Sequence, residues 1–231
     1  MELTSLISHW LASTPALLPD PAVQRWVWHG LWALVLASGV LRLARPLPRL
    51  YRLGLGVLVL GWTWLAGVQS PAHWLGLAFQ APSLMSVALC LGCCWTVVRP
   101  GARVPLASDA VSRLAWLGVT GVVLGWVLLL DTLAWWPVSL YAWGFSSAAM
   151  ATVALCAALF WALASANQAG RSAAGLVAGV LLLFVLTRWP TGNVWDALLD
   201  PWLWGVLQLR LIVSAARCWR APWRRPAPTR A

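Results

Sequence analysis

Seven apolar stretches, separated by short polar connections, constrain this chain more than any other feature. The stretches are residues 26–41, 53–68, 73–98, 114–130, 140–164, 173–186 and 202–216. A membrane core about 30 Å thick is crossed by a helix of roughly 20 apolar residues. Several stretches are shorter, but flanking arginine and tryptophan side chains extend the reach of a short span. Pro82 either kinks the third stretch or marks its true start.

The composition supports a membrane protein. Hydrophobic residues make up 61% of the 231 positions and charged residues only 10%, whereas soluble domains carry about 25% charged residues. We therefore predict an all-α, polytopic transmembrane helical bundle of about seven spans. The formal net charge of +10 does not indicate nucleic-acid binding, because the arginines fall between apolar stretches, where they act as topology signals.

The charges alternate along the connections. Arginine-bearing connections follow the first, third and fifth stretches and form the tail, whereas the N-terminal segment and the other connections are acidic, neutral or mixed. The positive-inside rule then places the N-terminus outside and the C-terminus in the cytoplasm, which requires an odd number of spans. Because Met1 and Glu2 begin no signal peptide, the first span is expected to target the chain. We predict a multi-pass protein of the bacterial cytoplasmic (inner) membrane.

Three regions are expected. Residues 1–24 form an N-terminal outer-surface amphipathic segment, because residues 3–13 have apolar side chains at helical spacing. Residues 25–216 form the seven-span domain, and residues 217–231 form an Arg/Pro-rich cytoplasmic tail that is expected to be disordered. A second surface helix is predicted at 194–200, with Asn193 and Asp196 as a capping pair and Asp200 capping the helix that follows.

The 20 tryptophans fall mostly on the predicted outer side. An aromatic belt in the lipid bilayer explains tryptophan at both interfaces, but it does not explain this imbalance. The excess favours a docking surface for a membrane or periplasmic protein partner, or a platform on which sugars or other rings stack. The belt alone remains the simplest interpretation.

Polar residues form two candidate sites. Asp131, Arg188, Asp196 and Asp200 form a candidate outer-face cluster, which could transfer protons or bind a cation. Helix capping with an Arg188 ion pair is the more common use of such residues. Gln208 and Arg210 are candidate intramembrane polar residues, and Arg210 either extends to the inner surface or binds an acidic group such as a lipid phosphate.

Cysteines and histidines indicate neither a metal site nor a cofactor. Cys90, Cys93 and Cys94 share one helix face, but no second cysteine pair or nearby histidine accompanies them. The histidines stand singly, whereas haem ligation by two histidines needs both at one depth. Small residues at small-xxx-small spacing predict close helix packing, either within the bundle or with a partner, and the pairs are Gly121 with Gly125 and Gly175 with Gly179.

The sequence contains no zinc-protease, serine-hydrolase or phosphate-loop motif. We therefore predict a non-catalytic accessory, scaffold or assembly component of an envelope complex. Two alternatives stay open. One is a small-molecule or lipid transporter or channel that uses Gln208 and Arg210. The other is an intramembrane enzyme that acts on a lipid-linked substrate with the outer-face aspartates, so enzymatic activity is left undecided.

Overall fold

The computed structural model describes residues 21–98, 115–135, 139–164 and 168–220, and every regular element in these ranges is helical. The all-α prediction is confirmed. A long helix covers most of each apolar stretch: α2 (Pro21–Leu43), α3 (Arg49–Thr63), α5 (Leu84–Val98), α7 (Ala115–Thr132), α9 (Ser147–Ala164), α10 (Gln168–Thr187) and α12 (Pro201–Arg220). The short elements are η1 (Gly67–Gln69), α4 (Pro71–Phe79), α8 (Leu140–Trp143) and α11 (Val194–Leu198).

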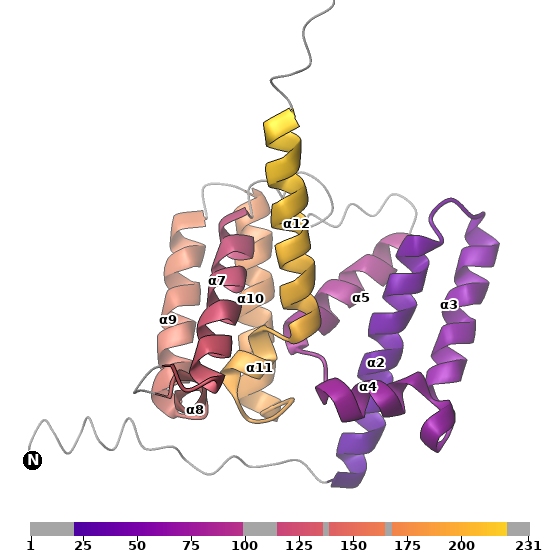
Figure 1. Cartoon of the computed structure of the whole chain (residues 1–231), viewed down its shortest axis with the longest axis horizontal. Coiled ribbons are helices and arrows are strands. Elements are labelled where there is room, and N and C mark those ends of the chain that lie inside the picture. Colours follow the sequence, from indigo (N-terminus) through magenta and orange to yellow (C-terminus); the bar gives the residue numbers. More distant parts are fainter. Residues whose placement is uncertain (1–20, 99–114, 136–138, 165–167, 221–231) are drawn as a thin grey trace, which may run out of the picture.

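The long helices run alternately in opposite directions, and all the short elements gather toward one end of the bundle (Figure 1). We call this the lower end, and it holds residues 64–83, 139–146 and 188–200. The opposite, upper end holds the turn between α2 and α3 and the last residues of α5, α9 and α12. The predicted surface segment 1–24 and tail 217–231 lie mostly outside the described residues, although α2 begins at Pro21 and α12 continues to Arg220.

Among the described residues, one helix is long and apolar enough to cross a membrane. In α2 the qualifying stretch is Trp26–Leu43, and shorter apolar stretches lie in four other helices: Leu84–Val97, Gly118–Thr132, Ser147–Ala162 and Ala174–Thr187. Large apolar side chains also remain exposed on the flanks of the bundle, such as Val57 at 67% and Leu182 at 62%. Water-soluble proteins rarely expose such surfaces over several helices, so the fold supports association with a membrane.

Two of the predicted stretches are interrupted. The third is divided into α4 and α5, and Pro82 lies in the break, so Pro82 precedes the start of α5 and does not kink a continuous helix. The fifth is divided into α8 and α9 around Gly144. The apolar parts of α5 and α9 that remain, Leu84–Val97 and Ser147–Ala162, are shorter than the Trp26–Leu43 stretch of α2.

Side-chain caps explain where helices begin at the lower end. Oxygen atoms of the capping residues accept hydrogen bonds from backbone N–H groups two or three positions further on, which satisfies donors that the first turn leaves unpaired. These residues are Ser70, Ser83, Ser139, Ser146, Asn193 and Asp200. The starts predicted at Asn193 and Asp200 are therefore observed, and Pro201 occupies the first position of α12.

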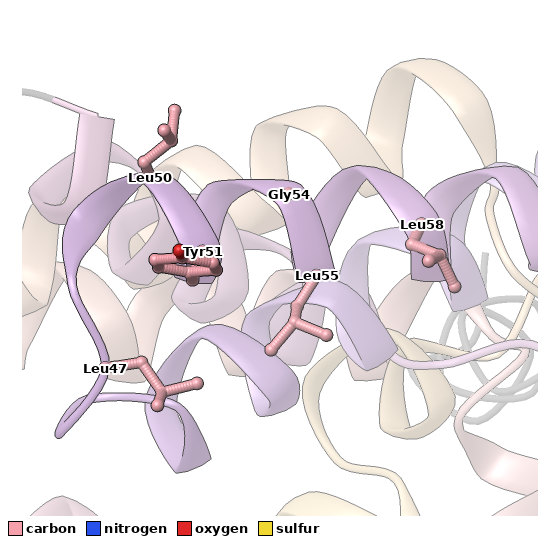
Figure 2. A pocket seen from close by; sticks show the side chains of 6 residues that line it. All are labelled: Leu47, Leu50, Tyr51, Gly54, Leu55 and Leu58. Carbon is pink, nitrogen blue, oxygen red and sulfur yellow. The ribbon is translucent and has the colours of Figure 1, made fainter.

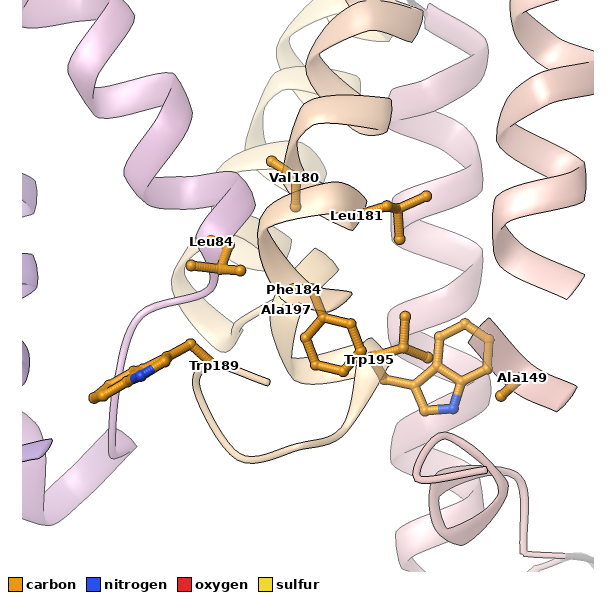
Figure 3. Packing of buried hydrophobic residues seen from close by; sticks show 9 residues of the cluster. Leu84, Ala149, Val180, Leu181, Phe184, Trp189, Trp195 and Ala197 are labelled. Carbon is orange, nitrogen blue, oxygen red and sulfur yellow. The ribbon is translucent and has the colours of Figure 1, made fainter. Parts of the chain in front are cut away.

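The bundle has two halves. In one half α2 packs against both α3 and α5, and in the other α9 packs on α10 and α7 packs on α12. Contacts of α5 with α10 and α11 join the halves. The main apolar cluster lies at this junction near the lower end, where Phe184, Val194 and Trp195 pack together (Figure 3). The helices are thus held most firmly at the lower end.

Only one of the two glycine pairs packs closely inside the chain. A Cβ atom at Gly121 or Gly125 would overlap Leu207 or Trp204 of α12, so α7 and α12 approach through these glycines. Gly175 and Gly179 of α10 have open space where a Cβ would stand. Close packing within the bundle is confirmed for the first pair. Gly175 and Gly179 make no such contact among the described residues, so packing of this pair against a partner stays a prediction.

Candidate functional site: the polar cluster at the lower end

Asp131 lies in the last turn of α7 and holds the start of α8. Its two carboxylate oxygens accept hydrogen bonds from Leu140 N at 3.0 Å and Tyr141 N at 2.7 Å. Asp131 is nine and ten residues from these partners in the chain, and the arrangement depends on α7 and α8 meeting at the lower end (Figure 1). Both oxygens of Asp131 therefore serve the backbone.

Asp196 joins α11 to α8 and to the loop before α11. Its Oδ2 atom accepts hydrogen bonds from the Tyr141 hydroxyl at 2.8 Å and the Thr191 hydroxyl at 2.5 Å. Burial raises the pKa of Asp196 above its usual range, although these hydrogen bonds act in the opposite direction. Burial, followed by the neighbouring Asp196, also raises the pKa of Tyr141. The phenol therefore stays protonated and donates.

Asn193 completes the connection between α8 and α11. Its amide nitrogen donates to Tyr141 O at 2.9 Å, and its amide oxygen accepts from Trp195 N at 3.0 Å. The Trp195 indole donates to Leu140 O at 3.0 Å, and Val194 N donates to Gly144 O at 3.1 Å. Asn193 is fully buried, and a buried amide with both ends paired strongly specifies one geometry.

Asp200 binds elements that are far apart in the sequence. One oxygen accepts from Leu203 N at 2.7 Å and caps α12, and the other accepts from Ser83 N at 2.8 Å at the start of α5. Asp200 is only 8% exposed and Ser83 is fully buried. The Trp32 indole donates to Gln80 O at 2.8 Å, which satisfies a carbonyl of the same break between α4 and α5.

Arg188 does not pair with the aspartates. Its Nη1 atom donates to Met150 Sδ at 2.8 Å, and its guanidinium lies 5.8 Å from the centre of the Phe184 ring. The three described carboxylates accept hydrogen bonds from backbone and hydroxyl groups instead. Within the described part of the chain, the expected ion pair of Arg188 with these aspartates is therefore wrong, and their oxygens accept from backbone and hydroxyl donors.

The four residues of the predicted cluster thus do not converge on one cleft. Tyr141 connects Asp131 and Asp196, since its N–H donates to the first and its hydroxyl to the second. Asp200 acts separately at the junction of α5 and α12, and Arg188 faces Met150 and Phe184. We call the hydrogen-bonded group of Asp131, Tyr141, Thr191, Asn193 and Asp196 the lower cap.

The intramembrane candidates lie on α12. Arg210 is exposed and Gln208 is half-buried. An apolar hollow runs along the lower part of the same helix, but its lining residues include neither of them: Phe79, Pro201, Trp202, Gly205, Val206 and Leu209. On α5, Cys93 Sγ accepts a hydrogen bond from Arg42 Nε at 3.0 Å, which links the cysteine face to the upper end of α2.

Tryptophans in the helices and loops toward the lower end differ in exposure. Trp32, Trp189 and Trp195 are buried. Others remain about half or more exposed, and they are Trp26, Trp62, Trp64, Trp74, Trp126, Trp135 and Trp202. Four of these, Trp26, Trp62, Trp64 and Trp74, come from the neighbouring elements α2, α3 and α4 and the loop beside η1, and we call them the tryptophan face.

The sequence did not reveal three members of the network: Tyr141, Thr191 and Ser83. Tyr141 lies 55 residues from Asp196, and Ser83 lies 117 residues from Asp200. No local spacing signals such pairs. That only two tyrosines occur in the chain is the one feature that could have drawn attention to Tyr141.

The chain matches no protein-family model, no curated protein and no solved structure.

Proposed function

We propose that the chain is a seven-span protein of the bacterial cytoplasmic membrane, with its lower end outside and its upper end in the cytoplasm. The direction of the long helices alternates, and Asp131, Asp196 and Asp200 all occur at the lower end. The α2–α3 turn at the upper end carries Arg42, Arg45, Arg49 and Arg52. Such a distribution follows the positive-inside rule. The 15 residues of α3 extend only about 22 Å, so flanking arginine and tryptophan side chains supply the remaining reach.

Cysteine labelling tests the orientation. A single cysteine at position 228, in a chain whose five native cysteines are replaced by serine, should resist an impermeant maleimide in intact spheroplasts. A matched cysteine at Trp135, at the lower end and 75% exposed, should react. If position 228 reacts without permeabilisation, the orientation and the odd number of spans are both wrong.

Within this topology we propose a non-catalytic role, as an accessory, scaffold or assembly component of an envelope complex. The observation that carries this proposal is that the carboxylates of Asp131 and Asp200, which lie at the lower end, cap and join helices. Asp131 and Asp200 each use both oxygens to accept hydrogen bonds from backbone N–H groups, which is the arrangement of helix-capping side chains. These groups hold the outer ends of the helices in place and leave little for catalysis.

The tryptophan face is the proposed surface for the protein partner. Trp26 is 67% exposed and Trp74 is 58% exposed, while ring contacts hold the side chains in place. Trp26 lies 5.7 Å from Trp64, and Trp74 lies 5.6 Å from His73, between ring centres. Rigid aromatic side chains lose little entropy on binding and often dominate interface energies.

Native gel electrophoresis of membranes in mild detergent tests this role. The wild-type chain should migrate in a complex larger than its 25.1 kDa. Trp26→Ala should reduce that complex at least tenfold, the loss expected from a hot-spot residue. Trp219→Ala, at the upper end and 82% exposed, is the matched control and should leave it unchanged. A monomeric wild-type chain would refute the role.

The enzyme alternative retains one specific observation. Asp196 has a pKa raised by burial, which is a property of general acids. No second acid assists Asp196 among the described residues, because the oxygens of Asp131 and Asp200 accept hydrogen bonds from backbone N–H groups. An activity that Asp196→Asn abolishes, with the amount of folded protein unchanged, would favour the enzyme over the scaffold.

A further inference from the structure

We propose that the upper end of α3 is a binding site for an anionic phospholipid of the cytoplasmic leaflet. The head group lies over the α2–α3 turn, and an acyl chain lies in an apolar hollow along α3. This inference rests on the proposed topology, because that topology places the turn at the inner surface.

The hollow lies on the outer flank of α3. It has a volume of about 460 Å³, and Figure 2 shows its lining side chains following the helix from the turn toward its middle: Leu47, Leu50, Tyr51, Gly54, Leu55 and Leu58. Leu50 is 80% exposed and Leu58 is 65% exposed. Gly54 contributes no side chain, and a Cβ at this position would meet nothing within 4 Å. The hollow is therefore apolar and open to lipid.

Charge complementarity identifies the head group. Residues 42–52 contain four arginines and no acid, and the described aspartates all lie at the opposite end of the molecule. Arg45 is exposed in the turn, and Arg52 Nε is buried without a hydrogen-bond partner among the described residues. Arginine pairs well with phosphate because its N–H groups fit two phosphate oxygens.

The packing of α3 explains how both parts of one lipid are accommodated. A Cβ at Gly56 would lie 3.2 Å from Leu41 of α2, so this side of α3 faces α2. Arg52 lies one turn before Gly56 and therefore on the same side of α3. The hollow opens on the other side of α3. Long arginine side chains in the first turn of a helix reach toward its N-terminal end. Pro48 precedes α3 and no side chain caps its first turn, so the helix dipole adds to the positive potential.

An apolar hollow beside a basic turn fits a lipid better than a free phosphate. Free phosphate would use the arginines but would leave the hollow unused. A zwitterionic lipid would use the hollow, but its own positive group would offset the attraction of the four arginines to its phosphate. Only an anionic phospholipid uses both, and basic residues near a membrane surface contribute roughly fivefold each to its binding.

Native mass spectrometry of the purified full chain tests the site. The protein is mixed with dioleoylphosphatidylglycerol or dioleoylphosphatidylcholine in detergent micelles, and the retained lipid is counted. Phosphatidylglycerol should be retained at least tenfold better. Arg45→Gln should reduce its retention about fivefold, whereas Arg217→Gln, an exposed arginine on α12, should not. Equal retention of both lipids, or equal effects of both substitutions, overturns the proposal.

A second pair of variants tests the hollow without changing the charge. Gly54→Leu places a side chain in the hollow and should reduce retention of phosphatidylglycerol at least fivefold. Gly61→Leu, on the same helix and also in open space, should not. If both variants bind as the wild type does and inorganic phosphate displaces the lipid, the site binds phosphate and the lipid proposal is wrong. Micelles have no sides, so these results do not depend on orientation, which the cysteine labelling reports separately.

Discussion

Replacing Asp200 with alanine should destabilise the protein more than the loss of one helix cap. The substitution removes the cap of α12, which costs about 1 kcal/mol. It also leaves Ser83 N without its partner, and an unpaired buried N–H costs about 1–3 kcal/mol. Because Ser83 is fully buried, water does not readily replace the carboxylate. We expect the free energy of unfolding to fall by about 2–4 kcal/mol.

The measurement is an unfolding titration with sodium dodecyl sulfate in mixed micelles, followed by circular dichroism. Ser139→Ala is the matched control, because Ser139 caps α8 but is exposed and holds no second element, so it should cost about 1 kcal/mol. Asp200→Asn should fall between them, because one of the two accepting oxygens is replaced by an NH2 group that cannot accept a hydrogen bond. If Asp200→Ala costs no more than Ser139→Ala, the link between α5 and α12 contributes nothing and the reasoning is refuted.

Three further predictions concern the lower cap and the helix contacts. Asp196 has a raised pKa, so the folded state holds its proton more tightly, and stability should fall as the pH rises above the ordinary aspartate pKa of about 4; the wild-type melting temperature should then drop by more than that of Asp196→Asn, and equal drops would contradict the assignment. Gly125→Ala overlaps Trp204 and should cost about 1–3 kcal/mol in the same titration, whereas Gly179→Ala, in open space, should be neutral; similar values for the two would show that α7 and α12 are not closely packed. Asn193→Ala removes two buried hydrogen bonds and should cost about 2–4 kcal/mol, seen as an earlier unfolding midpoint; an unchanged midpoint would remove Asn193 from the network.

Much of the helical framework could be predicted from the sequence. Apolar stretches of sufficient length give helices wherever the chain can satisfy its own backbone in an apolar environment, and a long helix covers most of each predicted stretch. Local chemistry also located individual helix starts, since Asn193 and Asp200 cap the helices that follow them. These features depend on neighbours a few residues apart, which a sequence displays directly.

The candidate site was predicted less well. The sequence placed Asp131, Asp196 and Asp200 at one end but could not show that they bind different elements. It also assigned Arg188 an acidic partner, whereas the structure gives it Met150 and Phe184. Opposite charges that lie near each other often pair. Here the backbone N–H groups at the helix breaks bind the oxygens of Asp131 and Asp200 instead.

The sequence by itself determined the all-helical class, the division of charge between alternate connections and the positions of several helix starts, because each follows from local periodicity, composition or capping. Only the tertiary structure decided that the breaks around Pro82 and Gly144 are filled by side chains from distant helices: Asp200 at the first, and Asn193 and Trp195 at the second. The physical reason is that a buried backbone donor or acceptor must find a partner, and which residue supplies it depends on which helices pack together.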